Sequence, residues 1–453
     1  MTVPSNLPTD ILLLILEYFY DPAEIRRLSL VCRSWIPATR LCGFRRIQTR
    51  SWHHLLQLLL LCDSPKETLS NAHVKEVAFA LSDLGYSSFK IERFVETFGR
   101  SIHTLRLNGA GIPWEQVSRD TGEAILKAFG GLATRLELVQ FSFETSEAFV
   151  LLLQHFERLQ SLQLVECWYR ESHGPSAGIQ FDIGRITDLT LVSDPKGRLN
   201  TYGLFTNCNS LKVLRIRPSR ILDHSAERTA IKRILEEAGD SLEELDIEAK
   251  LPCEVHHIED VLERHYLFTS LNLKRNTNLR KLRVAIRFRD SDYTRRQPRD
   301  YLLPILRRLV EVPRLSAGLR LEVLDLPFIF DQEMEWDVLD NLLQHPRLPC
   351  LKEVRCHTFV CFSASDCANG DYTKPSETSD RGKELAEGLR RLKSRLRRCE
   401  ERGILVVDVD YGLLSIVEPN VEKEVPEVVA IESSGRGIFR RMKSAILRRW
   451  GRV

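Results

Sequence analysis

Cysteine and histidine gather at one place in the sequence in a way that suggests a metal site. Cys356, His357, Cys361 and Cys367 fall within the stretch CHTFVCFSASDC. Structural zinc sites take four such ligands, usually with Cys-x₂-Cys pairs, whereas this stretch offers Cys-x₄-Cys. Cys356 also occupies the inward position of a repeat described below. We therefore interpret it as a core residue and expect neither a metal nor a cofactor.

The residue patterns that accompany catalysis are missing from the sequence. It contains no Gly-x-Gly-x-x-Gly, no phosphate-binding loop ending in Gly-Lys-Ser/Thr, no Gly-x-Ser-x-Gly and no His-Glu-x-x-His. A reactive nucleophile, a metal-held water or a phosphate cradle would need one of these arrangements or an equivalent. We expect a protein that is not an enzyme.

The stretch LPTDILLLILEYFYDP near the N-terminus is almost continuously apolar or aromatic. A signal peptide begins with Lys or Arg, but residues 1–6 have neither, and Asp10 stands at the head of the run. A membrane span needs about twenty apolar residues, and this shorter run contains Glu17. The stretch instead predicts a helix that begins near Pro8 and is buried on more than one side.

A second helix is predicted directly after the first. Asp21, Pro22 and Glu24 supply an N-cap, a proline at the first helical position and an acid at the third. Apolar positions then continue through residues 25–41 into a third short helix. Three linked helices of this length form too small a core to be stable alone, so a partner or an adjoining domain is implied.

These residues resemble the F-box. The resemblance rests on LPTDILLLIL, on LSLVCRSW at residues 28–35 and on the closing Phe44-Arg45, and it covers residues 5–47. It implies that this domain docks on a Skp-family adaptor and, through it, on a cullin and RING ubiquitin ligase. In that family the Leu-Pro entry, the first helix and the second-to-third helix segment make or support the contact. The implied adaptor-binding residues are Leu7, Pro8, Ile11, Ile15, Leu28, Val31, Cys32 and Trp35. The alternative is that they are core residues of a helical subdomain.

A short apolar pattern recurs between residues 71 and 412. In its form, apolar-x-x-apolar-x-apolar, the last two residues suit one face of a short strand and the first enters from the preceding turn. The occurrences are Val74/Val77/Phe79, Ile102/Leu105/Leu107, Leu138/Phe141/Phe143, Leu159/Leu162/Leu164, Ile186/Leu189/Leu191, Leu211/Leu214/Ile216, Leu242/Leu245/Ile247, Leu279/Leu282/Val284, Leu321/Leu324/Leu326, Leu351/Val354/Cys356 and Ile404/Val407/Val409.

Segments with helical spacing lie between these strands. They are residues 124–129, 149–156, 231–238, 338–343 and 385–399. Regular alternation of strand and helix predicts parallel strands and an α/β fold. With most spacings between 25 and 42 residues, the region resembles the leucine-rich repeat, which implies a curved right-handed solenoid with parallel strands and outer helices. The Asn or Cys expected after the last leucine is clear only at Cys167, so a doubly wound α/β enzyme fold stays as the alternative.

The two resemblances together imply a fungal-type F-box and leucine-rich-repeat substrate adaptor. Such a protein would hold an unknown protein substrate on its repeat surface. A repeat scaffold that is not tied to ubiquitin ligation is the alternative. The remaining segments are a connecting helix within residues 48–70, a mobile loop at 363–383 and a linker at 413–435.

Charge and cysteine content indicate which partners and which cellular compartment to expect. The net charge is +3, but the last eighteen residues hold seven Lys/Arg and no acid, which leaves −4 for residues 1–435. A mildly acidic body is not expected to bind nucleic acid. The eleven cysteines are irregularly spaced and odd in number, so we expect reduced thiols and an intracellular protein of the cytoplasm, the nucleus or both.

The tail at residues 436–453 has the pattern of a basic amphipathic helix. Apolar residues recur on one face and Arg or Lys crowds the others, which is typical of a helix on an anionic membrane or in an acidic partner. Nuclear import would use the same residues, and a solvated, partly disordered terminus is the alternative. The residues concerned are Phe439, Arg440, Arg441, Met442, Lys443, Ile446, Arg448, Arg449 and Trp450.

The tail gives the first testable prediction. Arg440→Glu/Arg441→Glu should weaken binding of the full chain to anionic phospholipid vesicles in a sedimentation assay, because two of the tail's cations become acids. Equal sedimentation of the intact chain and a chain lacking the tail would remove the membrane interpretation.

Overall fold

A computed structural model describes most of the chain up to residue 410. The described residues are 9–16, 25, 27–28, 30, 35–49, 51–62, 74–81, 88–169, 180–193, 201–218, 225–251, 271, 273–288, 303, 306–307, 309–310, 319–327, 335–359 and 380–410. They all belong to one of two compact units, which is formed by Met1–Val360 and Pro375–Asp410. The predicted linker at 413–435 and the predicted tail at 436–453 lie outside the described residues.

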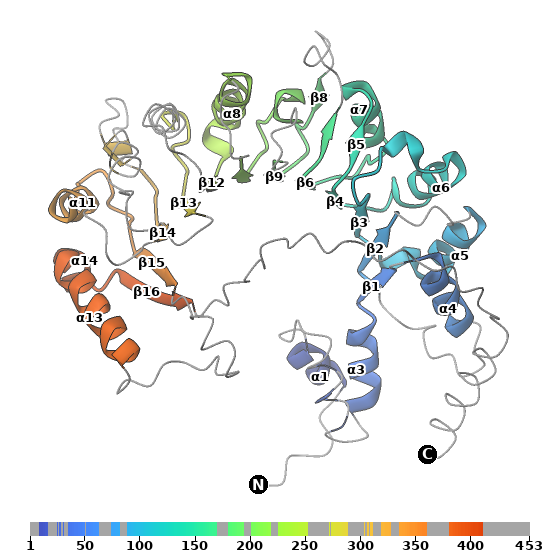
Figure 1. The fold of residues 1–453 in the computed structure, drawn as a ribbon, viewed down its shortest axis with the longest axis horizontal. Coiled ribbons are helices and arrows are strands. Elements are labelled where there is room, and N and C mark those ends of the chain that lie inside the picture. The colour runs from blue at the N-terminus through green and yellow to red at the C-terminus, as the bar shows by residue number, and fades with distance from the viewer. Residues whose placement is uncertain are drawn as a thin grey trace, which may run out of the picture. The chain divides into compact units, whose positions relative to one another are not determined.

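The main element of this unit is a parallel sheet of twelve strands (Figure 1). The strands follow one another in chain order, with β1 and β16 at the two ends, so the sheet is open. They are β1 (Arg46–Thr49), β2 (Glu76–Ala80), β3 (Thr104–Asn108), β4 (Arg135–Val139), β6 (Ser161–Val165), β9 (Asp188–Val192), β11 (Val213–Arg217), β12 (Glu244–Leu251), β13 (Lys281–Phe288), β14 (Val323–Pro327), β15 (Glu353–Phe359) and β16 (Leu405–Asp410). Two small sheets pair β5 (Ser142–Phe143) with β7 (Trp168–Tyr169) and β8 (Phe181–Asp182) with β10 (Phe205–Thr206).

Helices lie before β1 and in several of the connections between the strands. The α-helices are α1 (Thr9–Leu16), α3 (Trp35–Gly43), α4 (Trp52–Cys62), α5 (Ser88–Phe98), α6 (Arg119–Phe129), α7 (Ser146–Gln154), α8 (Ser225–Ala238), α11 (Trp336–Leu343), α13 (Asp380–Arg395) and α14 (Arg397–Glu401), with 3₁₀ turns η1 (Gly99–Ser101), η2 (Trp114–Gln116), η3 (Thr201–Leu204) and η4 (Gly239–Ser241). Helices α4 to α14 lie along one side of the row of strands (Figure 1). Among the described helices, none is long and apolar enough to cross a bilayer.

Alternate residues of each strand point into the layer between sheet and helices. In β3, Leu105 stands in register with Val77 and Leu136 on the neighbouring strands, and all three are fully buried. The same arrangement repeats along the sheet, so one apolar cluster extends from Ile47 to Ile404. The intervening residues of each strand point to the opposite face, which we call the open face.

Phenylalanine rings link the strands to the helices in the first half of the sheet. Phe79 of β2 lies 6.1 Å from Phe94 of α5 and 5.8 Å from Phe129 of α6, as measured between ring centroids, and both contacts are edge-to-face. Phe143 of β5 meets Phe149 of α7 at 5.0 Å in the same geometry. Such aromatic pairs add to the free energy gained by burial. They therefore fix these helices to the strands that they cover.

A buried asparagine performs the corresponding role between β12 and β13. The Asn276 amide nitrogen donates to the carbonyls of Leu235, at 3.0 Å, and Gly239, at 2.9 Å, near the end of α8. Asn276 has no exposed surface. Its side chain thus satisfies carbonyls that a helix leaves without partners at its C-terminal end.

The predicted apolar pattern is confirmed in β2, β3, β6, β9 and β11 to β15, but it is wrong at Leu138/Phe141/Phe143. The strand there is β4, in which Leu136 and Leu138 stand in register with Leu105 and Leu107. Phe143 belongs instead to β5 of a small sheet. The phase was misread because Ala133, which takes the first position of the true pattern, is small, whereas Leu138 fits both phases.

The first and last strands also differ from the expectation. β1 at Arg46–Thr49 falls among residues predicted to close the helical domain and begin the connecting helix, although it pairs with β2. In β16 the residues in register with Val354 and Cys356 are Leu405 and Val407, so the predicted pair Val407/Val409 is shifted by two positions.

The predicted helices that lie within the described residues are found, with changes at their boundaries; the predicted second helix after Asp21 lies mostly outside those residues. The apolar run at 52–62 is α4, and residues 385–399 form α13 and α14 with a break between Arg395 and Arg397. Residues 380–383, predicted as the end of the mobile loop, are instead the first turn of α13. The other residues of that loop, 363–379, are outside the described part.

We predict that Leu214→Ala lowers the free energy of unfolding by about 2–5 kcal/mol, the usual cost of removing a buried leucine from a packed core. Leu214 is fully buried in β11. Urea unfolding followed by circular dichroism measures the change. Leu214→Met, which keeps the volume, is the control and should cost less than about 1.5 kcal/mol; similar losses in both variants would contradict this packing.

Candidate functional site

The N-terminal helices build a small core of their own. Leu12 and Leu16 of α1 and Ala38 of α3 are buried together. Leu28 and Trp35, two of the residues predicted to bind an adaptor, pack against this cluster and are partly buried. Their position agrees with a supporting role at least as well as with direct contact.

Two apolar side chains of this region lie on the surface instead. Ile11 of α1 is 42% exposed and Leu30 is 85% exposed. Ile15, one turn after Ile11, is partly buried. Exposed aliphatic groups beside a small core are the kind of surface that a partner protein covers.

The sequence interpretation included Ile11 but missed Leu30. The sequence did hold a sign that Leu30 is exposed. Leu28 and Leu30 are two residues apart, and residues at that spacing do not share one helix face, so a helix that buries Leu28 turns Leu30 outward. Leu7, Pro8, Val31 and Cys32 lie outside the described residues, so their predicted role remains a prediction.

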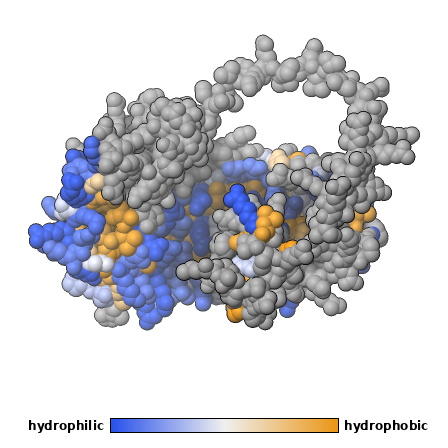
Figure 2. All heavy atoms as spheres, turned by 90° about the horizontal axis from the view of Figure 1, so that it is seen from below, coloured by the Kyte–Doolittle hydropathy of each residue, from blue (hydrophilic) through white to orange (hydrophobic). Residues whose placement is uncertain are grey.

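Charged side chains from neighbouring strands pair across the open face of the sheet. Arg215 of β11 lies 3.0 Å from Asp188 of β9 and 3.5 Å from Glu244 of β12, and Lys281 of β13 lies 3.4 Å from the same glutamate. Farther toward β1, Arg106 pairs with a glutamate of β4 at 3.4 Å. In Figure 2, which views the molecule from below, blue hydrophilic surface fills much of the described middle part, with smaller orange patches beside it.

A group of three buried acids surrounds Arg283 of β13. Its guanidinium lies 3.3 Å from Asp246, 3.5 Å from Glu248 and 3.5 Å from Asp325, on β12 and β14. All three carboxylates are buried, and the Arg283 side chain is only 21% exposed. Burial works against the charge of Arg283, but the three carboxylates outweigh it and raise its pKa. Arg283 therefore stays charged and balances acids on two strands.

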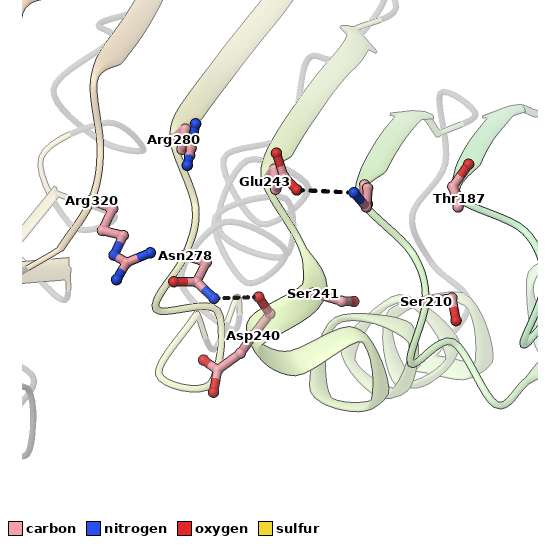
Figure 3. A pocket seen from close by; sticks show the side chains of 9 residues that line it. Thr187, Ser210, Asp240, Ser241, Glu243, Asn278, Arg280 and Arg320 are labelled. Atoms are coloured by element: carbon pink, nitrogen blue, oxygen red, sulfur yellow. Dashed lines mark hydrogen bonds and ion pairs between the residues drawn. The ribbon is translucent and has the colours of Figure 1, made fainter.

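A pocket of about 450 Å³ opens at the edge of the sheet where β9 and β11 to β14 begin (Figure 3). Its wall is formed by polar and charged residues, among them Lys212, Asp240, Asn278, Arg280 and Arg320. No sequence motif collects these residues, because they come from the turns before five different strands.

Two buried cysteines of the described part are poorly suited to metal binding. Burial raises the pKa of Cys167 to about 12, and burial together with Asp340 raises the pKa of Cys399 to about 12. Zinc binds the thiolate, so such thiols bind it poorly. Cys356 is buried as expected for a core position, whereas Cys361 and Cys367 are outside the described residues. Within the described ranges no three metal-ligating side chains converge.

Comparison with known proteins identifies one region of the chain. A family model described as F-box-like matches residues 4–36, which contain α1 and the segment up to the start of α3. A search among curated proteins found no match. The predicted F-box at 5–47 is thus confirmed as an F-box-like domain at 4–36. Phe44, which the sequence interpretation gave to the F-box, packs instead against the core of the sheet.

Replacing Arg283 by Met should lower the free energy of unfolding by about 3 kcal/mol, because buried carboxylates lose their central partner. Urea unfolding measures the loss. Arg135→Met alters an exposed arginine of β4 on the same face and should change stability by less than about 0.5 kcal/mol. If the two variants unfold at the same urea concentration, the Arg283 cluster does not stabilise the sheet.

Proposed function

We propose that this chain is the substrate-recognition subunit of a Skp/cullin/F-box ubiquitin ligase. The observation that carries the proposal is the F-box-like domain at residues 4–36. F-box domains generally bind Skp-type adaptors, and the adaptor would connect the chain to a cullin and RING ligase.

The surface of the N-terminal helices supports this role. Leu30 and Ile11 offer exposed aliphatic side chains, while Leu12 and Leu16 hold α1 in place from beneath. Side chains held on a folded segment lose less conformational entropy on binding than those of an unfolded one. We place the adaptor contact on Ile11 and Leu30, together with Leu7 and Pro8.

The sheet would supply the second surface, for a protein target. Parallel strands in chain order, with helices on one side, support a leucine-rich-repeat-like solenoid whose open face is available for binding. The rows of paired charges on that face offer polar contacts at fixed spacing. Electrostatic complementarity of this kind favours selectivity between partners more than raw affinity.

In this proposal the chain performs no bond chemistry. It brings the target close to ubiquitin carried by other subunits and thereby raises the effective concentration of the target. The protein would act inside the cell, in the cytoplasm or nucleus. The buried acids Asp246, Glu248 and Asp325 would be structural in this account, since all three lie beside Arg283.

Leu30→Asp in the full chain should weaken capture of a purified Skp-family adaptor at least tenfold, because a carboxylate would enter an apolar contact. Affinity is measured by biolayer interferometry. Leu60→Asp and Leu151→Asp change leucines of α4 and α7 that are 61% and 51% exposed, and should leave affinity unchanged.

The adaptor assignment is wrong if the native chain captures no adaptor. A repeat scaffold unconnected to ubiquitin ligation would then be the better account. If all three leucine variants lose adaptor equally, the contact does not lie on the N-terminal helices.

A further inference from the structure

We propose that the pocket at the start of β11 to β14 is an anion-binding subsite for an acidic segment of a protein partner. Two arginines, Arg280 and Arg320, would hold its carboxylate or phosphoryl oxygens. This inference rests on the proposed function, because it assigns a chemical class of target to the edge of the sheet surface.

The two arginines are brought together by the pairing of β13 with β14. The Arg280 carbonyl accepts from the backbone N–H groups of Glu322, at 2.7 Å, and Val323, at 3.0 Å. This pairing sets Arg280 beside the turn that carries Arg320. In Figure 3 the Arg320 side chain extends from that turn toward Asn278, and both arginines line the pocket. The two side chains are exposed.

The acids of the pocket wall are already engaged. Glu243 pairs with Lys212 at 3.5 Å. The Asp240 carboxylate accepts from the backbone N–H of Thr277 at 3.3 Å and from the hydroxyl of the same residue. The Asn278 amide donates to the Asp240 carbonyl at 2.8 Å. The acids and the amide of the pocket wall are thus already bound to other groups of the protein.

One further acid lies near Arg280. Glu322 binds Lys352 at 2.8 Å, and its pKa is lowered by that hydrogen bond and the lysine's charge, and then by Arg280. Glu322 is therefore shared between two cations and neutralises only one of them.

Counting these groups gives a positive excess. The cations Lys212, Arg280, Arg320 and Lys352 face the acids Asp240, Glu243 and Glu322, so four positive charges less three negative charges leave +1. For Arg280 and Arg320, the structure gives no hydrogen bond from the guanidinium to any of the described residues. Guanidinium groups bind carboxylate and phosphoryl oxygens in paired hydrogen bonds, so an oxyanion is the ligand that fits.

The subsite is tested with the full chain and fluorescent peptides. One peptide is a run of eight glutamates, and a second carries a single phosphoserine among alanines. Arg280→Glu/Arg320→Glu should weaken binding of the better peptide at least tenfold by fluorescence anisotropy, and binding to the native chain should fall as salt rises. Arg135→Glu, an exposed arginine of β4, is the matched control and should bind like the native chain.

Three outcomes would overturn the subsite. They are equal binding by the double variant and the native chain, equal loss in the Arg135 control, and displacement of the peptide by inorganic phosphate at a concentration equal to the peptide's own Kd. The last outcome would assign the pocket to free phosphate. Adaptor capture is measured on the same proteins: it should be unchanged in the double variant, and its absence from the native chain would count against the proposed function and not against the subsite.

Discussion

The structure depends on the fact that no strand of this sheet can bury its apolar side chains alone. Each strand contributes about two of them, and they are covered only when the strands and helices on either side are in place. The buried cluster that runs from Ile47 to Ile404 is the result. The strands pair in chain order, and β1 and β16 stand at the two ends without pairing to each other, so the sheet stays open.

This constraint also fixes the chemistry of the open face. A slip of one residue would turn the charged positions of β12 and β13 into the core, at a prohibitive cost. Asp246 and Glu248 can therefore stand two residues apart beside Arg283, and the pocket edge can collect arginines from turns that are far apart in sequence. The surface offered to a partner is thus determined by packing on the opposite side of the sheet.

Much of the fold could be predicted from the sequence. The strand and helix periodicities are clear wherever the two inward-pointing residues of a strand are large and apolar. Prediction failed where this apolar pattern was weak, or where it fitted two alternative phases. Ala133 is too small to mark the turn before β4, and Thr49, buried in β1, is polar. For the sites, Leu30 was missed because apolar residues were assigned to burial, although it is 85% exposed. Arg280 and Arg320 become neighbours only through strand pairing, which a local motif does not contain.

In the proposed function, the N-terminal helices assemble with a ligase and the sheet selects the target. Quantitative mass spectrometry after cross-linking in cells tests this division most directly, by measuring both the proteins captured by the chain and the ubiquitin remnants on them. With Leu30→Asp, the account predicts the same captured proteins as with the native chain, but loss of chain-dependent ubiquitylation. Unchanged ubiquitylation alongside loss of adaptor capture, or loss of the captured proteins themselves, would contradict it.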